Sequence, residues 1–280
     1  MRSLKLWPDK DIVVKKVYAS FDKHKIPLLI LKRKDHKANT PGILWIHGGG
    51  YVTGMKEMVY LGRAEALVKK YDAVVISVGY RLSTFHPFPD GFNDCYNALL
   101  YMKEHAKSLG IRDDQIMVGG ESAGGGLCAA VCMKARDTKD VNIAYQMPLY
   151  PMIDNFDTNS SKNNHAKIWN TKKNHKAWTM YLKNLDNVTA YAAPARQTDY
   201  SNLPPAYTFV GTAEPFYDET LTFIDNLKKA GVEAYVDIYD GMYHAFDMME
   251  PDLDISKRAI QNFEKHFEYA MNNYFAKQNN

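Results

Sequence analysis

The stretch Gly120-Glu121-Ser122-Ala123-Gly124 decides the fold of this chain, and it follows directly on the apolar run Ile116-Met117-Val118. The pattern G-x-S-x-G is typical of a very tight strand-to-helix turn that holds a serine in a strained backbone conformation, with its hydroxyl clear of the sheet edge. The positions two before and two after the serine come so close that only glycine fits. A glycine-rich turn with an incidental serine is the alternative, and the rest of the chain favours Ser122 as a nucleophile.

A second glycine-rich loop lies upstream, where the apolar run 42–46 ends in His47-Gly48-Gly49-Gly50. Acyl transfer passes through a tetrahedral oxyanion, which is best stabilised by preorganised backbone N–H groups. A glycine run exposes such groups, and the residue after the nucleophile, Ala123, supplies another. We expect His47 to support this loop and to take no part in the chemistry.

A histidine, His244, lies in the segment Tyr239–Phe246, just after the strand-like segment Ala234–Ile238. It comes downstream of the serine, in the chain order serine, acid, histidine. The chain holds nine histidines, and none of the others has a comparable sequence context. His244 is therefore the predicted general base.

With these segments, the chain resembles the α/β-hydrolases of the hormone-sensitive-lipase-like esterase family. Tyr80–Pro89 is similar to the family's Y-R-L-A-P-E-H-P-F-P, and 203–207 and 211–219 resemble its L-P-P and D-P-L-x-D-E motifs. The similarity runs from about Gly42 to Phe246. It implies an α/β-hydrolase fold, with a mostly parallel central sheet, helices on both faces and a small cap.

The resemblance also implies an activity, that of a cofactor-independent carboxylesterase working through an acyl-enzyme. In the family, the second and third glycines of H-G-G-G donate to the oxyanion. Gly49 and Gly50, together with Ala123, are accordingly the expected oxyanion-binding residues.

The acid of the triad departs from the family pattern. The family has aspartate at the first position of D-P-L-x-D, where this chain has Glu214. Glutamate can serve, because the carboxylate need only accept the imidazole N–H and stabilise the imidazolium. Asp218 is the alternative acid, although it would also make a good N-cap for the helical pattern that follows it.

Alternating strand and helix patterns predict a parallel sheet covered on both faces, as a single domain over residues 1–280. A hairpin at the sheet edge is expected from 12–20 and 26–31. Further strands are expected at 43–47, 73–79, 116–120, 144–149, 206–211 and 233–239, and helices at 57–70, 92–108, 123–136, 219–230 and 255–275.

The stretch 152–200 interrupts this alternation and is too long for a simple crossover. In the resembling family an insertion here caps the active site, so we expect a small cap. Trp169, Trp178 and Tyr181 either line an acyl or alcohol pocket or pack the cap onto the body. His165 and His175 lack a carboxylate partner in the sequence pattern, and we predict no metal site.

Composition predicts an ordinary enzyme without nucleic-acid or membrane partners. Lysine and arginine exceed aspartate and glutamate by 35 − 32 = +3, so neither a polyanion nor an anionic membrane is implied. The beginning, Met1-Arg2-Ser3-Leu4, lacks the apolar core of a signal peptide, and Cys95, Cys128 and Cys132 form no disulfide framework, which predicts the cytoplasm. A homodimer is expected by family analogy alone.

The small cap favours short acyl chains in a small-molecule ester. A related serine hydrolase acting on an amide, formamide or carbonate is an alternative that the triad alone does not distinguish. A non-catalytic small-ligand receptor on the same fold is another, although a receptor has no need of the histidine that His244 provides.

Overall fold

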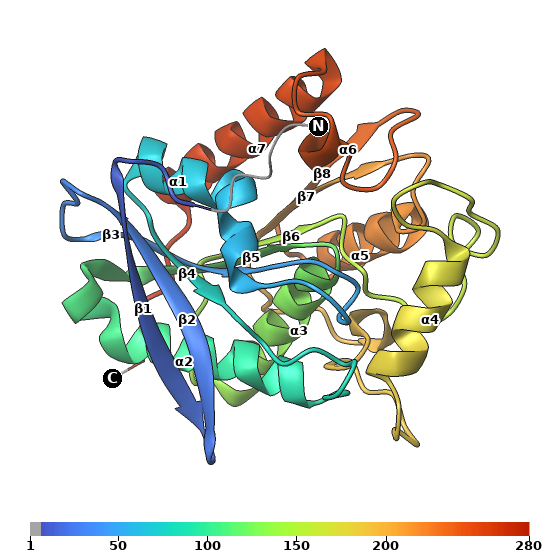
Figure 1. Cartoon of the computed structure of the whole chain (residues 1–280), viewed down its shortest axis with the longest axis horizontal. Coiled ribbons are helices and arrows are strands. Elements are labelled where there is room, and N and C mark those ends of the chain that lie inside the picture. The colour runs from blue at the N-terminus through green and yellow to red at the C-terminus, as the bar shows by residue number, and fades with distance from the viewer. Residues whose placement is uncertain (1–6, 280) are drawn as a thin grey trace.

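The computed structural model of the chain describes residues 7–279, so the interpretation of residues 1–4 lies outside the described part. Its centre is an eight-stranded sheet in the order β1-β2-β4-β3-β5-β6-β7-β8 (Figure 1). The pairs from β4 through β3 to β8 are parallel, and β2 is antiparallel to both β1 and β4. The strands are β1 Ile12–Phe21, β2 His24–Arg33, β3 Thr40–Ile46, β4 Val74–Val78, β5 Ile111–Glu121, β6 Tyr145–Leu149, β7 Ala206–Gly211 and β8 Ala234–Tyr239.

Helices cover both faces of this sheet (Figure 1). One core packs α1 and α7 against the sheet, and on the opposite face α2, α3 and α5 are packed in two further clusters. The predicted mostly parallel α/β architecture is confirmed. The helices are η1 Lys56–Leu61, α1 Arg63–Tyr71, α2 Asp90–Leu109, α3 Ala123–Thr138, α4 Thr171–Tyr181, η2 Pro194–Arg196, α5 Tyr217–Lys229, α6 Phe246–Met249 and α7 Asp254–Asn273.

The hairpin expected at the sheet edge is present, because β1 pairs with β2 along its whole length and is the first strand in the sheet order. The single helix expected over 57–70 is wrong. Gly62 is extended, with φ −133° and ψ −157°, and it separates the 3-10 helix η1 from α1. Glycine weakens a helix at this point because it gains no side-chain contacts and loses much backbone entropy.

The carboxyl ends of the parallel strands bring the predicted site residues to one edge of the sheet. His47–Gly50 follow β3, Ser122 follows β5, Glu214 follows β7 and His244 follows β8. Ligands of open α/β sheets bind at this edge, where the loops leave the strands.

The segment between β6 and β7 contains one α-helix, α4, which lies beyond the carboxyl ends of the strands (Figure 1). Tyr181 at the end of α4 stacks on Tyr51, with ring centroids 3.9 Å apart, and Trp178 contacts the same tyrosine at 5.4 Å. These buried aromatic contacts attach α4 to the body of the protein. Within residues 7–279, no helix is long and apolar enough to cross a membrane.

Candidate active site

The turn from β5 to α3 holds Ser122 in a strained conformation, with φ 57° and ψ −122°. Its two flanking glycines are required by close approach. A Cβ on Gly124 would lie 2.1 Å from the carbonyl oxygen of Ile46, and one on Gly120 would lie 2.5 Å from the carbonyl oxygen of Gly124. The tight elbow expected from the sequence is therefore present, and it places the serine at the N-terminus of α3.

Ser122, His244 and Glu214 form one hydrogen-bonded chain. His244 Nε2 lies 2.9 Å from Ser122 Oγ, and His244 Nδ1 lies 2.5 Å from Glu214 Oε2. All three side chains are buried. Tyr150 and Phe216 enclose the imidazole edge-to-face, each with its ring centroid 5.0 Å away. The structure thus brings together the three residues predicted for a triad.

The loops that carry Glu214 and His244 are tied to each other. Ala213 N donates to the Met242 carbonyl at 3.0 Å, and a Cβ on Gly211 would lie only 2.0 Å from that carbonyl oxygen. Glu214 Oε1 accepts a hydrogen bond from the Gly211 N–H at 3.0 Å. This contact leaves Oε2 for the histidine and sets the direction of the carboxylate.

The glycine loop after β3 adopts conformations that favour glycine, with φ 118° at Gly49 and 60° at Gly50. A Cβ on Gly49 would lie 2.2 Å from the Thr53 carbonyl oxygen, and one on Gly50 would lie 2.2 Å from the Trp169 ring. Ala123 is the first residue of α3, where helical N–H groups have no acceptor within the helix. These N–H groups are the predicted oxyanion donors.

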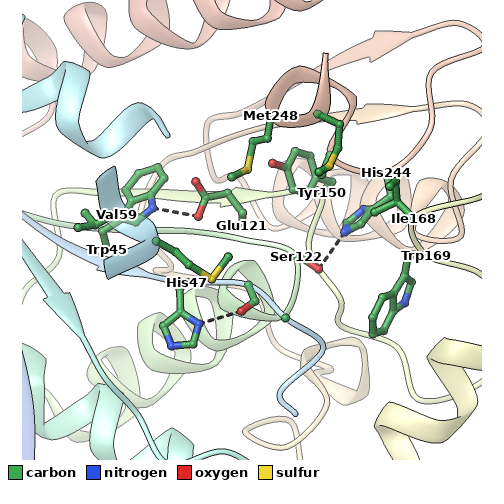
Figure 2. Close-up of a pocket in the computed structure, with 15 residues that line it drawn as sticks. Trp45, His47, Val59, Glu121, Ser122, Tyr150, Ile168, Trp169, His244 and Met248 are labelled. Carbon is green, nitrogen blue, oxygen red and sulfur yellow. Dashed lines mark hydrogen bonds between the residues drawn. The ribbon is translucent and has the colours of Figure 1, made fainter. Parts of the chain in front are cut away.

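A pocket opens beside Ser122 and His244, and its wall is mostly apolar (Figure 2). Trp169 lines this pocket, whereas Trp178 and Tyr181 do not, so these three aromatic residues from the segment between β6 and β7 have two different roles. The pocket is lined by Trp45, His47, Gly48, Gly49, Met58, Val59, Glu121, Ser122, Tyr150, Ile168, Trp169, His244, Ala245, Met248 and Met249.

Known proteins resemble this chain over most of its length. A family model described as alpha/beta hydrolase fold matches residues 43–248. The chain belongs to this family. Esterase LipI of Mycobacterium tuberculosis is 31% identical over 214 residues, 75% of this chain and 67% of that protein. Carboxylesterase NlhH of the same species is 32% identical over 217 residues, 74% of this chain and 67% of that protein.

A solved structure, that of a bacterial heroin esterase, is similar with a TM-score of 0.90 at 29% identity, covering 96% of this chain and 87% of that chain. This hydrolase chain spans about two thirds of the length of the two curated relatives, at 67% of each. The resemblance to hormone-sensitive-lipase-like esterases is confirmed, and the relatives support a carboxylesterase-type hydrolase.

Asp218, the alternative acid of this hydrolase, is hydrogen-bonded to Ser160, whereas the carboxylate on His244 is that of Glu214. Its Oδ2 accepts a hydrogen bond from Ser160 N at 2.7 Å, and its own N–H donates to Ser160 Oγ at 3.1 Å. The expectation that Asp218 caps α5 is wrong, because the N-cap is Phe216 and Asp218 is the second residue of the helix. It ties the segment after β6 to α5, and an acidic side chain in the first turn also favours the helix dipole.

His47 supports the glycine loop, as its position before the loop suggested. Its ring is buried, stacks on Tyr80 with centroids 4.2 Å apart, and has Nδ1 2.8 Å from the Gly48 carbonyl oxygen (Figure 2). Burial lowers the pKa of His47 from 6.5 to about 4, against the opposing effect of the Gly48 hydrogen bond. His47 is therefore neutral in the folded protein at neutral pH.

This burial predicts acid sensitivity. Below pH 6.5 the unfolded chain protonates His47, whereas the folded protein does not until about pH 4. The free energy of unfolding should thus fall by about 1 kcal/mol for each pH unit in this window. Urea titrations of wild type and His47→Gln between pH 7 and pH 4 isolate this contribution, since other groups titrate in both proteins. Equal pH dependence in the two would contradict the assignment.

Several residues around the site carried no sequence signal. Arg63 and Asp247 are buried and form an ion pair near Glu121, and Tyr150 stands against the His244 ring. Of the residues in this group, only Glu121 belongs to a recognisable sequence motif, as the variable residue of the G-x-S-x-G elbow.

The two histidines considered as metal ligands, His165 and His175, do not form a metal site with other residues that the structure describes. His175 pairs with Asp157 at 2.7 Å, and among residues 7–279 no group of three or more histidine, cysteine, aspartate or glutamate side chains is arranged to hold a metal ion.

Proposed function

We propose that this protein is a carboxylesterase that hydrolyses short-chain acyl esters through Ser122, His244 and Glu214. The observation that carries the proposal is the hydrogen-bonded chain from Glu214 through His244 to Ser122, at the wall of an apolar pocket. The esterase relatives support the same reaction class.

In the first half of the reaction, Ser122 Oγ attacks the ester carbonyl while His244 Nε2 takes its proton. Glu214 accepts the Nδ1–H bond, holds the imidazole in the required tautomer and stabilises the imidazolium. The N–H groups of Gly49, Gly50 and Ala123 stabilise the oxyanion that develops on the carbonyl oxygen. The imidazolium then protonates the leaving alcohol, and an acyl-enzyme remains.

In the second half, water enters and His244 removes its proton as it attacks the acyl-enzyme. A second oxyanion forms in the same hole, and its collapse breaks the bond to Ser122 Oγ, which regains the proton from His244. The carboxylic acid leaves, and the starting state is restored. No cofactor takes part in this proposed mechanism.

The test is a pre-steady-state measurement with p-nitrophenyl acetate. The proposed mechanism gives a burst of p-nitrophenol stoichiometric with enzyme when deacylation is slower than acylation, and peptide mapping finds the acetyl group on Ser122. Steady turnover of p-nitroacetanilide at a rate equal to that of the ester would favour the amidase alternative. Binding of esters without turnover would favour the receptor.

The substrate-size prediction rests on the cap that we propose for residues 152–200. Trp169 from this segment stands over Gly50 and beside Phe216, with ring centroids 6.4 Å apart, so it limits the space next to the nucleophile. We expect kcat/KM to peak between acetyl and hexanoyl esters in a p-nitrophenyl series from acetyl to palmitoyl. A maximum at long acyl chains, or activation at a lipid–water interface, would show that the pocket is not closed in this way.

A further inference from the structure

One carboxylate lies in the wall of the otherwise apolar pocket. Glu121 precedes the nucleophile, and its side chain is 9% exposed, with that exposure at the pocket (Figure 2). As far as residues 7–279 are concerned, the lining contains no other aspartate or glutamate and no lysine or arginine. The proposed mechanism gives Glu121 no task.

Neighbouring groups compensate the negative charge of the Glu121 carboxylate only in part. Glu121 Oε2 accepts a hydrogen bond from Trp45 Nε1 at 2.9 Å, while Oε1 lies 3.7 Å from the nearest Arg63 nitrogen, too far for a hydrogen bond. Arg63 is paired more closely with Asp247, which is also buried. Two carboxylates thus share one guanidinium, and the group carries a net negative charge when both are ionised.

Arg63 is buried and has other partners besides Glu121. Its guanidinium lies over the rings of Phe209 and Phe263, 4.9 and 5.6 Å from their centroids, and its side chain is 3% exposed. A buried charge that is not fully paired is unfavourable, and a cation brought by a ligand would relieve it. The apolar walls formed by Trp45, Val59 and Met248 suit the methyl groups of a quaternary ammonium, and Trp45 offers an aromatic ring.

We propose that Glu121 is a specificity-determining residue that selects esters carrying a cationic ammonium group on the arm that enters this pocket. The inference rests on the proposed esterase function and narrows its substrate class. Recognition would come from the electrostatic attraction between the Glu121 carboxylate, which lies in a poorly solvated pocket wall, and a weakly hydrated ammonium cation.

The test uses pairs of esters that have the same shape and differ in charge. Butyrylcholine and 3,3-dimethylbutyl butyrate differ only by nitrogen for carbon in the alcohol. The p-nitrophenyl esters of 4-(trimethylammonio)butyrate and 5,5-dimethylhexanoate differ in the same way in the acyl group. The quantity compared is the ratio of kcat/KM for the cationic ester to that for the neutral one, in wild type and variants. The inductive effect of the ammonium cancels in that comparison.

We expect the ratio in one of the two series to fall at least about tenfold in Glu121→Gln, since a charge is lost close to the bound cation. The series that responds identifies the arm that enters the pocket. The glutamine amide oxygen can still accept the Trp45 hydrogen bond, and the melting temperature reports whether the variant is folded. The matched control is Glu250→Gln, which removes the same charge from an exposed residue just outside the lining and should leave the ratio unchanged.

A second measurement needs only the wild-type protein. Burial raises the pKa of Glu121 to about 7, although Arg63, the Trp45 hydrogen bond and a hydrogen bond from the backbone of Glu121 itself oppose this. The other polar groups around it are Asp247, which pairs with Arg63, and Tyr150, whose pKa burial raises so that it stays neutral. The ratio should therefore increase as pH rises through about 7, because a pH effect that is common to both esters cancels in it.

The outcomes separate the two proposals. Absence of turnover for every ester, cationic and neutral alike, would overturn the esterase function, and the inference with it. Turnover of neutral esters with no fall of the ratio in Glu121→Gln in either series would overturn the role of Glu121 alone. If Glu121→Gln does not fold, the pH dependence of the kcat/KM ratio in the wild type decides the role of Glu121. A ratio that does not change with pH overturns this role, and a ratio that rises with pH supports it.

Discussion

Replacing Glu214 by glutamine is expected to lower kcat about 10⁴-fold, the size of effect seen when a triad carboxylate becomes an amide. The structure explains the direction. The Gly211 N–H needs an acceptor and will take the amide oxygen, because it bonds Oε1 in the wild type. The amide NH₂ then faces His244 Nδ1, which must accept a hydrogen bond from it and therefore carries no proton. The imidazole proton moves to Nε2, the atom that should receive the proton of Ser122.

The matched control for this variant is Asp218→Asn, the same chemical change four residues along the chain. Asp218 bonds Ser160, and the asparagine oxygen can keep that contact. We expect kcat to stay within a fewfold of wild type and stability to change by at most about 1 kcal/mol. Measurement of kcat and of the melting temperature for both variants decides the acid. Loss of turnover in Asp218→Asn, with Glu214→Gln active, would reverse the assignment.

Gly49→Ala is expected to lower kcat on the order of 10²–10³-fold, as loss of one oxyanion donor does. Gly49 has φ 118°, and the new methyl group would lie 2.2 Å from the backbone oxygen of Thr53, so the loop must shift and carry its N–H away. Because this clash is with a backbone atom, no change of side-chain rotamer can relieve it. The substrate KM should change much less than kcat, because the donor acts on the developing oxyanion.

The control for this variant is Gly231→Ala, which also places alanine at positive φ, 78°, but where no atom of residues 7–279 lies within 4 Å of the new methyl group. It should cost about 1 kcal/mol of stability or less and leave kcat unchanged. Steady-state kinetics and thermal melts on both variants separate backbone strain from loss of the donor. Full turnover in folded Gly49→Ala protein would place the oxyanion hole elsewhere.

Much of the site could be predicted from local sequence, because the constraints that shape it act between near neighbours. Gly120 and Gly124 are needed by the turn around Ser122, where a Cβ would meet backbone atoms. The H-G-G-G run and the histidine after the last parallel strand could be predicted for a similar reason, because each lies in a short segment that directly follows a predicted strand. Alternation of apolar strands and amphipathic helices likewise predicted the layered sheet.

Contacts between elements distant in the chain were decided only by the tertiary structure. Glu214 and Asp218 are both acidic and close in sequence, and only the tie between the loops after β7 and β8 places Glu214 on the histidine. Packing likewise put Trp169 in the pocket and Trp178 on Tyr51. The pairing of Arg63 with Asp247, and the partial compensation of Glu121, had no local pattern at all. Backbone strain and hydrophobic periodicity depend on residues that are close in the sequence, so they can be predicted from it. The distance between two side chains on different elements depends on how those elements pack, so it is known only from the tertiary structure.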